Sequence, residues 1–231
     1  MSEVQKIIVK ITEKINTLLG VALEFLFPLN CMGCGEKHMP LCNQCILKCD
    51  RAENFSIQWI ESVFSYKDPI IRKILWNIKY KGDTTAINVL GNALYDVIIS
   101  KIYGDVLFEK TSCYKIIPIP ISKKDLKKRG YNQSELLARA MCKNDLSGIF
   151  NIETTVLCKN KNIKKQMSVK NKVGRKKNIN GCFSIRNNIL IKNQEIILID
   201  DIVTTGATLT EAKNVLLSAG AKKVLGFTIA H

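Results

Sequence analysis

The chain has 231 residues, of which 46% are hydrophobic, and 35 Lys and Arg against 20 Asp and Glu give it a formal net charge of +15. This ordinary apolar fraction excludes a disordered chain, a collagen-like repeat and a low-complexity scaffold. The charge is concentrated, because residues 121–192 hold 18 basic and 4 acidic side chains, a net charge of +14. We expect that segment to face an anion such as phosphate, pyrophosphate or a nucleic acid.

Residues 1–27 are predicted to form an amphipathic helix, because apolar side chains recur at helical spacing from Val4 to Leu19. Lysines precede an apolar stretch at residues 18–29, as in a signal peptide, but Glu24 interrupts it and no small-residue cleavage site follows. About 12 apolar residues are also too few to cross a bilayer, which takes roughly 20. We therefore expect a cytoplasmic protein without stable membrane insertion; docking of this helix on a membrane surface is the minor alternative.

A C-x2-C-x7-C-x2-C array lies within residues 28–50 and consists of Cys31, Cys34, Cys42 and Cys45. Each C-x2-C turn lets two thiolates hold one side of a tetrahedral Zn²⁺, and four thiolates complete a closed structural site. We predict a zinc knuckle whose folding energy comes from the metal. A redox dithiol is the alternative, and His38 and Cys49 are alternative ligands. The scattered cysteines are expected to be buried small hydrophobes: Cys113, Cys142, Cys158 and Cys182.

Residues 51–231 alternate strand-like and helix-like segments, which predicts an α/β domain with a parallel sheet and helices on its faces. Strands are expected at residues 62–66, 115–119, 154–157, 195–199 and 223–229, and helices at residues 69–79, 87–99, 135–143 and 209–218. A polar, basic stretch without hydrophobic periodicity occupies residues 159–180. A loop of this length inside a domain is typical of a functional lid or of a disordered segment.

The segment 195–211, EIILIDDIVTTGATLTE, reads as a buried strand that ends in Asp200 and Asp201, followed by a small polar loop and a helix. Ligands of open parallel sheets bind beyond the carboxyl ends of the strands. Backbone N–H groups and hydroxyls at a helix N-terminus suit a monophosphate, and ionised carboxylates suit the vicinal hydroxyls of a ribose. We predict a ribose-5-phosphate site, with the phosphate at Thr204, Thr205, Gly206, Ala207 and Thr208. An ordinary strand–helix connection, or the acidic pair of a receiver domain, would explain only half of this pattern.

Part of this segment, ILIDDIVTTGATLTE, resembles the phosphoribosyl-pyrophosphate (PRPP) signature of type I phosphoribosyltransferases. Four further segments extend the resemblance to the ComF family, competence-associated proteins that join a zinc knuckle to a phosphoribosyltransferase domain: LFPLNCMGCG, LCNQC, IKYKGD at residues 78–83 and IPIPISKKDLKKRGYNQSELLA at residues 117–138. It covers most of residues 26–231 in the expected order. The resemblance implies a type I phosphoribosyltransferase-like fold for residues 51–231.

The resemblance also implies roles for individual residues. Asp200 and Asp201 would serve the transfer reaction, with Mg²⁺ accompanying PRPP. Pyrophosphate would lie against the loop after an early strand and under a basic lid, at Ser122, Arg129, Gln166 and Arg175. Lys79 and Tyr80 would form part of a hood over the acceptor, although helix capping and core packing of Tyr80 explain them equally well.

These features favour an enzyme over a pure binding module. It would transfer phosphoribosyl from PRPP to an unidentified nitrogenous acceptor, release pyrophosphate and act in DNA uptake during natural transformation. The alternative is a catalytically inactive fold that serves as a single-stranded DNA-binding or competence-machinery adaptor. In that case the zinc knuckle and the basic residues 121–192 would contact DNA or competence proteins, although the basic loop lacks the interleaved aromatic side chains that stack on bases.

Overall fold

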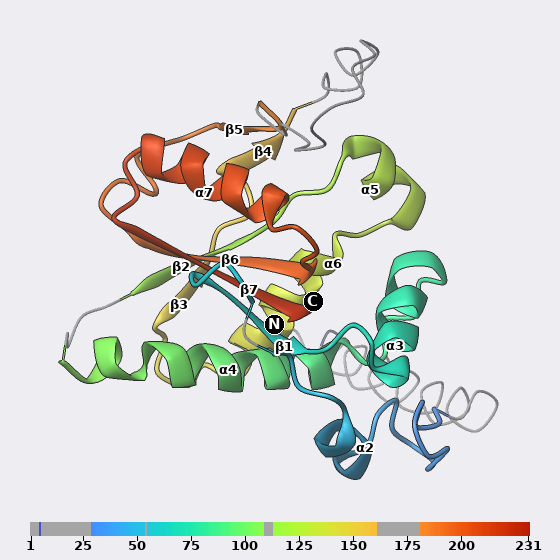
Figure 1. Ribbon diagram of the computed structural model, residues 1–231. Coiled ribbons are helices and arrows are strands. Elements are labelled where there is room, and N and C mark those ends of the chain that lie inside the picture. The colour runs from blue at the N-terminus through green and yellow to red at the C-terminus, as the bar shows by residue number, and fades with distance from the viewer. Residues whose placement is uncertain (1–4, 6–28, 54, 109–112, 161–180) are drawn as a thin grey trace. The chain divides into compact units, whose positions relative to one another are not determined.

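Parallel strands form the framework of residues 49–231 in the computed structural model (Figure 1). The structure describes residues 5, 29–53, 55–108, 113–160 and 181–231, with the backbone alone at residues 105–108. The helix expected over residues 1–27 and most of the basic loop lie outside these residues. The chain divides into two compact units, Met1–Lys48 and Cys49–His231.

The main sheet of the described residues has five strands in the order β1-β7-β6-β2-β3, and every neighbouring pair is parallel. The strands are β1 Ile60–Phe64, β2 Tyr114–Pro118, β3 Phe150–Ile152, β6 Glu195–Ile202 and β7 Lys223–Ala230. The central strand β6 is buried on both faces, because Ile196, Ile197, Leu198 and Ile199 are each at most 1% exposed. A continuous apolar run of this kind is typical of a parallel sheet covered on both sides. The predicted fold class is confirmed.

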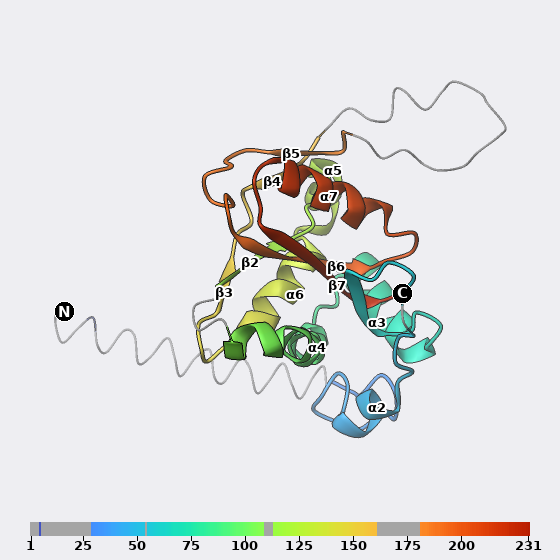
Figure 2. The ribbon, with the colours of Figure 1, turned by 60° about the vertical axis from the view of Figure 1, so that its left-hand side comes forward.

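Helices cover both faces of this sheet (Figures 1 and 2). On one face lie α4 Ile87–Phe108 and α6 Gln133–Cys142, and on the other lies α7 Ala207–Ser218. Beside α7, the strands β4 Leu157–Lys159 and β5 Phe183–Ile185 form a separate antiparallel pair. Two further helices lie beyond the carboxyl ends of the strands: α3 Pro69–Tyr80 and α5 Lys123–Arg129.

The predicted elements of this unit are all present, with shifts of up to three residues at most of their ends, but α4 continues nine residues beyond the predicted end at residue 99. The strand expected at residues 154–157 is β4, which begins at Leu157 and pairs with β5 rather than with the main sheet. Three short elements, β3, α5 and β5, were not expected, because three to seven residues carry too little periodicity to be recognised. Among the described residues, none of the helices is long and apolar enough to span a membrane.

Two helices of one face approach each other closely at a glycine. An added Cβ at Gly91 of α4 would lie 2.6 Å from the Cβ of Ala140 in α6 and 2.9 Å from its carbonyl carbon. These distances leave no room for a methyl group without a shift of helix α6. Gly91 is therefore a point of tight packing between α4 and α6.

We expect Gly91→Ala to lower the free energy of unfolding by about 1–3 kcal/mol, because an extra methyl group in a tightly packed contact forces the two helices apart. Gly104→Ala in the same helix is the matched control. An added Cβ there meets no atom within 4 Å, so the change should raise stability by about 0.5–1 kcal/mol through helix propensity. Urea unfolding of both variants measures the difference, and equal stabilities would contradict the close packing of α4 on α6.

Candidate functional site

Two adjacent carboxylates lie at the end of β6 and receive hydrogen bonds from the first turn of α6. Ser134 Oγ donates to Asp200 Oδ1 at 2.9 Å, and Gln133 Nε2 donates to Asp201 Oδ2 at 3.1 Å. Asp201 is 8% exposed. Burial and the neighbouring charge of Asp201 raise the pKa of Asp200 to about 7, although the bond from Ser134 opposes this rise. The pair is thus a partly desolvated site whose oxygens accept hydrogen bonds.

Hydrogen bonds between side chains link this pair to Arg129. The Nη1 of Arg129 donates to Gln133 Oε1 at 3.0 Å, and the amide nitrogen of Gln133 donates in turn to Asp201. The structure therefore connects the residue predicted for pyrophosphate with one of the residues predicted for ribose. Gln133 and Ser134 were not recognised as site residues from the sequence. Their signal was their place at the start of a helix, directly after the RGYN turn.

The turn between α5 and α6 is fixed by side-chain caps. Asn132 Oδ1 accepts from the backbone N–H of Ser134 at 3.1 Å, while its Nδ2 donates to the carbonyl of Ile119 at 3.0 Å. Gly130 adopts a left-handed φ of +83° between the two helices. Ser122 caps the start of α5, since its Oγ accepts from the N–H of Asp125 and donates to its carboxylate at 2.5 Å. The hydroxyl of Ser122 is thus engaged locally in this structure.

The predicted phosphate loop forms a small cavity of about 40 Å³ at the N-terminus of α7. It brings together Asp200 and the predicted loop residues, and its lining is Asp200, Ile202, Val203, Thr204, Thr205, Gly206, Ala207, Thr208 and Leu209. Gly206 caps the helix with a φ of +72°, and an added Cβ would lie 2.5 Å from Ile57 Cδ1. The backbone angle favours glycine here, because L side chains rarely adopt this φ. The free N–H groups of a first helical turn suit an anion.

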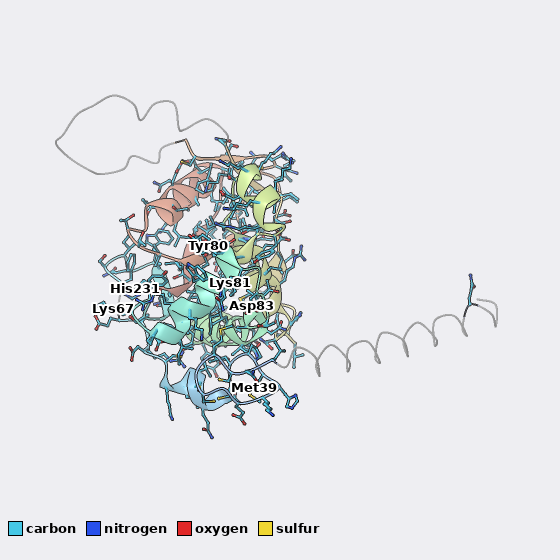
Figure 3. All side chains as sticks on the ribbon, turned by 90° about the vertical axis from the view of Figure 1, so that its right-hand side faces the viewer. Met39, Lys67, Tyr80, Lys81, Asp83 and His231 are labelled. Carbon is cyan, nitrogen blue, oxygen red and sulfur yellow. The ribbon has the colours of Figure 1, made fainter. Side chains whose placement is uncertain are left out.

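A larger cavity of about 430 Å³ lies between the end of α3 and the α5–α6 turn. It is lined by Lys79, Tyr80, Lys81, Gly82, Asp125, Lys128, Arg129 and Tyr131. The hydroxyl of Tyr131 donates to the carbonyl of Ile78, which ties the turn to α3. Figure 3 shows Tyr80 and Lys81 at the end of that helix. Tyr80 is 60% exposed, so core packing of this side chain is wrong, and the structure places both predicted hood residues in one cavity with Arg129.

The cysteine cluster belongs to the other unit, Met1–Lys48. The first C-x2-C pair lies on a tight turn, in which the N–H of Gly35 donates to the carbonyl of Cys31 at 2.9 Å. The second pair lies at the start of helix α2 Asn43–Lys48. The four sulfur atoms lie within 4.8 Å of one another. This group of described residues contains neither of the alternative ligands, His38 and Cys49.

The donor geometry fits a tetrahedral metal. Cys34 Sγ and Cys42 Sγ are 3.7 Å apart, and thiolates bound to one tetrahedral Zn²⁺ lie about 3.8 Å apart. The N–H of Cys42 donates to Cys31 Sγ at 3.3 Å. Burial raises the pKa of Cys31, but backbone hydrogen bonds outweigh it and lower the pKa to about 6. Crowding acts the other way on Cys45, whose hydrogen bond with Cys42 and burial raise its pKa to about 12. A divalent cation is the group that would let all four ionise together.

The remaining predicted site residues are placed as follows. Gln166 and Arg175, expected in the lid, lie outside the described residues. The scattered cysteines do not behave as expected: Cys113 is exposed and the other three are half-buried, so the expectation of four buried hydrophobes is wrong.

Comparisons with known proteins identify the class of this chain. Residues 128–230 match the family model described as the phosphoribosyl transferase domain, and this segment holds Arg129, Gln133, the acidic pair and the phosphate loop. Two solved structures are matched over 62% of this chain at low identity. One is a hypoxanthine phosphoribosyltransferase from Staphylococcus aureus, 13% identical over 61% of its length with a TM-score of 0.36. The other is the allosteric regulatory enzyme of purine biosynthesis, 16% identical over 25% of its length with a TM-score of 0.35. The molecule is a phosphoribosyltransferase-like protein.

Two curated relatives narrow this class. The competence protein ComFC of Bacillus subtilis strain 168 is 30% identical over 169 residues, which are 73% of this chain and 62% of that protein. The ComFC protein of Streptococcus pneumoniae R6 is 27% identical over 206 residues, which are 87% of this chain and 80% of that protein. The chain belongs to the ComF family. It spans less than two thirds of the length of the Bacillus relative.

We expect the purified chain to bind one Zn²⁺ at the cysteine cluster. Cys34→Ser should lower the affinity for Zn²⁺ by more than roughly 10–100-fold. That is the loss expected when a residue that only orients a ligand is removed, whereas this substitution removes a ligand. Elemental analysis and competition with a chelating dye measure this. Cys113→Ser, an exposed thiol outside the cluster, is the matched control and should bind normally. Full metal content in the double variant Cys34→Ser/Cys42→Ser would contradict the four-cysteine site.

Proposed function

We propose that this protein binds Mg²⁺–PRPP at the carboxyl edge of its sheet and transfers the phosphoribosyl group to a nitrogenous acceptor, with release of pyrophosphate. The single observation that carries the proposal is the pairing of two acceptor carboxylates with an anion-sized cavity at a helix N-terminus, both supplied by the β6–α7 connection. One part suits hydroxyl donors and the other suits a phosphate. A ribose 5-phosphate carries both groups in one small ligand.

In this proposal each group of residues has a separate task. The N–H groups and hydroxyls of residues 204–208 hold the 5-phosphate. The ribose hydroxyls donate to Asp200 and Asp201, which Ser134 and Gln133 hold in place. Arg129 faces the pyrophosphate, because a guanidinium binds phosphate oxygens through two N–H groups at once. Bound Mg²⁺ would supply further positive charge for the pyrophosphate.

In this proposal the protein promotes the transfer by positioning the substrates and by stabilising the charge of the leaving group. The lone pair of the acceptor nitrogen forms the bond to C1 of the ribose, and the C1–O bond breaks with its electrons on the pyrophosphate oxygen. Arg129 stabilises the charge that develops on this leaving group, while the acidic pair fixes the ribose ring. No side chain forms a covalent bond in this scheme. Gln166 and Arg175 would cover the pyrophosphate and exclude water.

The remaining parts complete the proposal. In this proposal residues 28–50 are a zinc-stabilised module, and residues 51–231 are the transfer domain. The names of the Bacillus and Streptococcus relatives support a place in competence, and we assign the protein to the cytoplasmic handling of incoming DNA.

The double variant Asp200→Asn/Asp201→Asn should bind Mg²⁺–PRPP at least about tenfold more weakly than the wild type, because each substitution removes charge-assisted hydrogen bonds to the ribose. Isothermal titration measures the affinity. Asp96→Asn, an exposed carboxylate of α4, is the matched control and should bind like the wild type. If the wild type binds no PRPP, or the double variant binds it unchanged, the proposed function is rejected.

A second candidate function, binding of single-stranded DNA, is favoured by one surface feature. Trp76 and Tyr80 of α3 are 48% and 60% exposed and their ring centroids are 5.6 Å apart. Lys81 Nζ lies 5.2 Å from the ring of Trp76, and Lys79 Nζ lies 5.9 Å from that of Tyr80. Exposed aromatic rings beside lysines can stack on bases and contact the backbone phosphates.

If this surface binds DNA, Trp76→Ala should lower the affinity for a single-stranded oligonucleotide by about 1–3 kcal/mol, the energy of one stacked base. Fluorescence anisotropy at several salt concentrations measures the affinity and the number of phosphate contacts. Tyr103→Ala, an equally exposed aromatic residue on α4, controls for loss of an aromatic side chain elsewhere. An equal effect of both substitutions would reject the α3 surface as the DNA site.

A further inference from the structure

The larger cavity, between α3 and the α5–α6 turn, has the size of a small-molecule site. Its volume of about 430 Å³ lies in the range of roughly 300–1,000 Å³ that ligand pockets occupy. The cavity at the phosphate loop is ten times smaller, about 40 Å³. Two cavities of such different size suit two different ligand groups. The smaller one suits a single phosphate, whereas the larger one suits a ring system.

The lining of the larger cavity is strongly cationic. Four basic side chains face one carboxylate, a net charge of +3: Lys79, Lys81, Lys128 and Arg129 against Asp125. The Asp125 carboxylate is already counted in this net charge, and it accepts a hydrogen bond from Ser122. The bond from Ser122, opposed by burial and helped by nearby cations, keeps the pKa of Asp125 below its usual range. A neutral ligand would leave this net positive charge uncompensated.

Two tyrosine rings give the cavity a flat apolar component. Tyr80 is 60% exposed and is backed by Trp76, with ring centroids 5.6 Å apart. Tyr131 is held in place by its hydroxyl, which donates to the carbonyl of Ile78. Rings of this kind contact the face of a planar ligand. Inorganic pyrophosphate has no such face and would leave both rings uncovered.

Arg129 connects the cavity to the proposed transfer site. It lines the cavity, and its guanidinium reaches Asp201 through a single intervening side chain, Gln133, by hydrogen bonds of 3.0 Å and 3.1 Å. An occupant of the cavity that contacts Arg129 is therefore linked to Asp201 through these two hydrogen bonds. Such a link suits the second substrate of the proposed transfer.

We infer that the cavity binds the acceptor and that the acceptor is a planar nitrogen heterocycle carrying a carboxylate or phosphate group. This inference rests on the proposed function. The anionic group pairs with Lys79, Lys81 and Lys128, and the ring lies against the tyrosines. A ring nitrogen forms the bond to C1, the C1–O bond breaks with its electron pair on pyrophosphate, and the proton of the nitrogen passes to water.

Matched pairs of ligands test the charge preference without knowledge of the natural acceptor. Orotate carries a carboxylate that uracil lacks. Nicotinate likewise carries a carboxylate where nicotinamide carries a neutral carboxamide. Titration of the full chain should show that the anion of each pair binds at least about tenfold more tightly, the effect of one charge-assisted hydrogen bond. Lys79→Gln/Lys81→Gln should reduce this preference to about threefold or less. Lys73→Gln, an exposed lysine on the same helix outside the cavity, should leave it unchanged.

Three results would overturn the inference. They are equal binding of the two members of each pair, a preference that survives the double lysine substitution, and competitive displacement of orotate by inorganic pyrophosphate. The last result would assign the cavity to the leaving group. A separate PRPP titration distinguishes the two proposals. Absence of PRPP binding rejects the transfer function, whereas PRPP binding without selectivity between orotate and uracil rejects only the anionic acceptor.

Discussion

Two adjacent carboxylates at the end of a buried strand impose the constraint on which the functional edge depends. Desolvation and the neighbouring charge of Asp201 disfavour the charged form of Asp200 and raise its pKa to about 7. Hydrogen-bond donors must offset this cost. Both side-chain donors come from the first turn of α6, through Gln133 and Ser134. Helix α6 must therefore begin beside the end of β6, which the cap at Asn132 and its bond to the end of β2 ensure.

The same turn shapes the second cavity. Because α6 begins where it does, the residues before it are carried toward α3, and Tyr131 bonds to the carbonyl of Ile78. Gly130 has a left-handed backbone conformation, which ends α5 and lets the chain turn toward α6. The end of α5 thus brings Lys128 and Arg129 to the cavity wall. One connection between two helices thus holds the acidic pair in place and builds the cationic cavity. A change in this turn would disturb both sites at once.

Sequence reasoning succeeded where the signal was local. The strand–loop–helix unit at residues 195–218 and the cysteine array are each contained in a short segment, and the structure forms the phosphate-loop cavity and the sulfur cluster there. It missed Gln133 and Ser134, whose carboxylate partners lie 68 and 66 residues away in sequence. Contacts of this separation depend on how a helix packs on the sheet. Strand β4 shows the same limit, because its apolar residues indicated a strand but could not identify β5 as the partner.

The distribution of charge in the fold differs from its distribution along the sequence. Of the described residues in the basic segment 121–192, Lys128 and Arg129 line the cavity as cations, while Lys79 and Lys81 come from a part of the chain that is nearly neutral overall. The fold therefore brings together cations from distant parts of the sequence.

Gln133 explains how this cationic site can lie beside an acidic pair. A direct ion pair between Arg129 and Asp201 would satisfy each charge with the other. The neutral amide of Gln133 instead bonds to both and keeps them apart, so the guanidinium retains N–H groups for an anion and the carboxylates retain oxygens for hydroxyls.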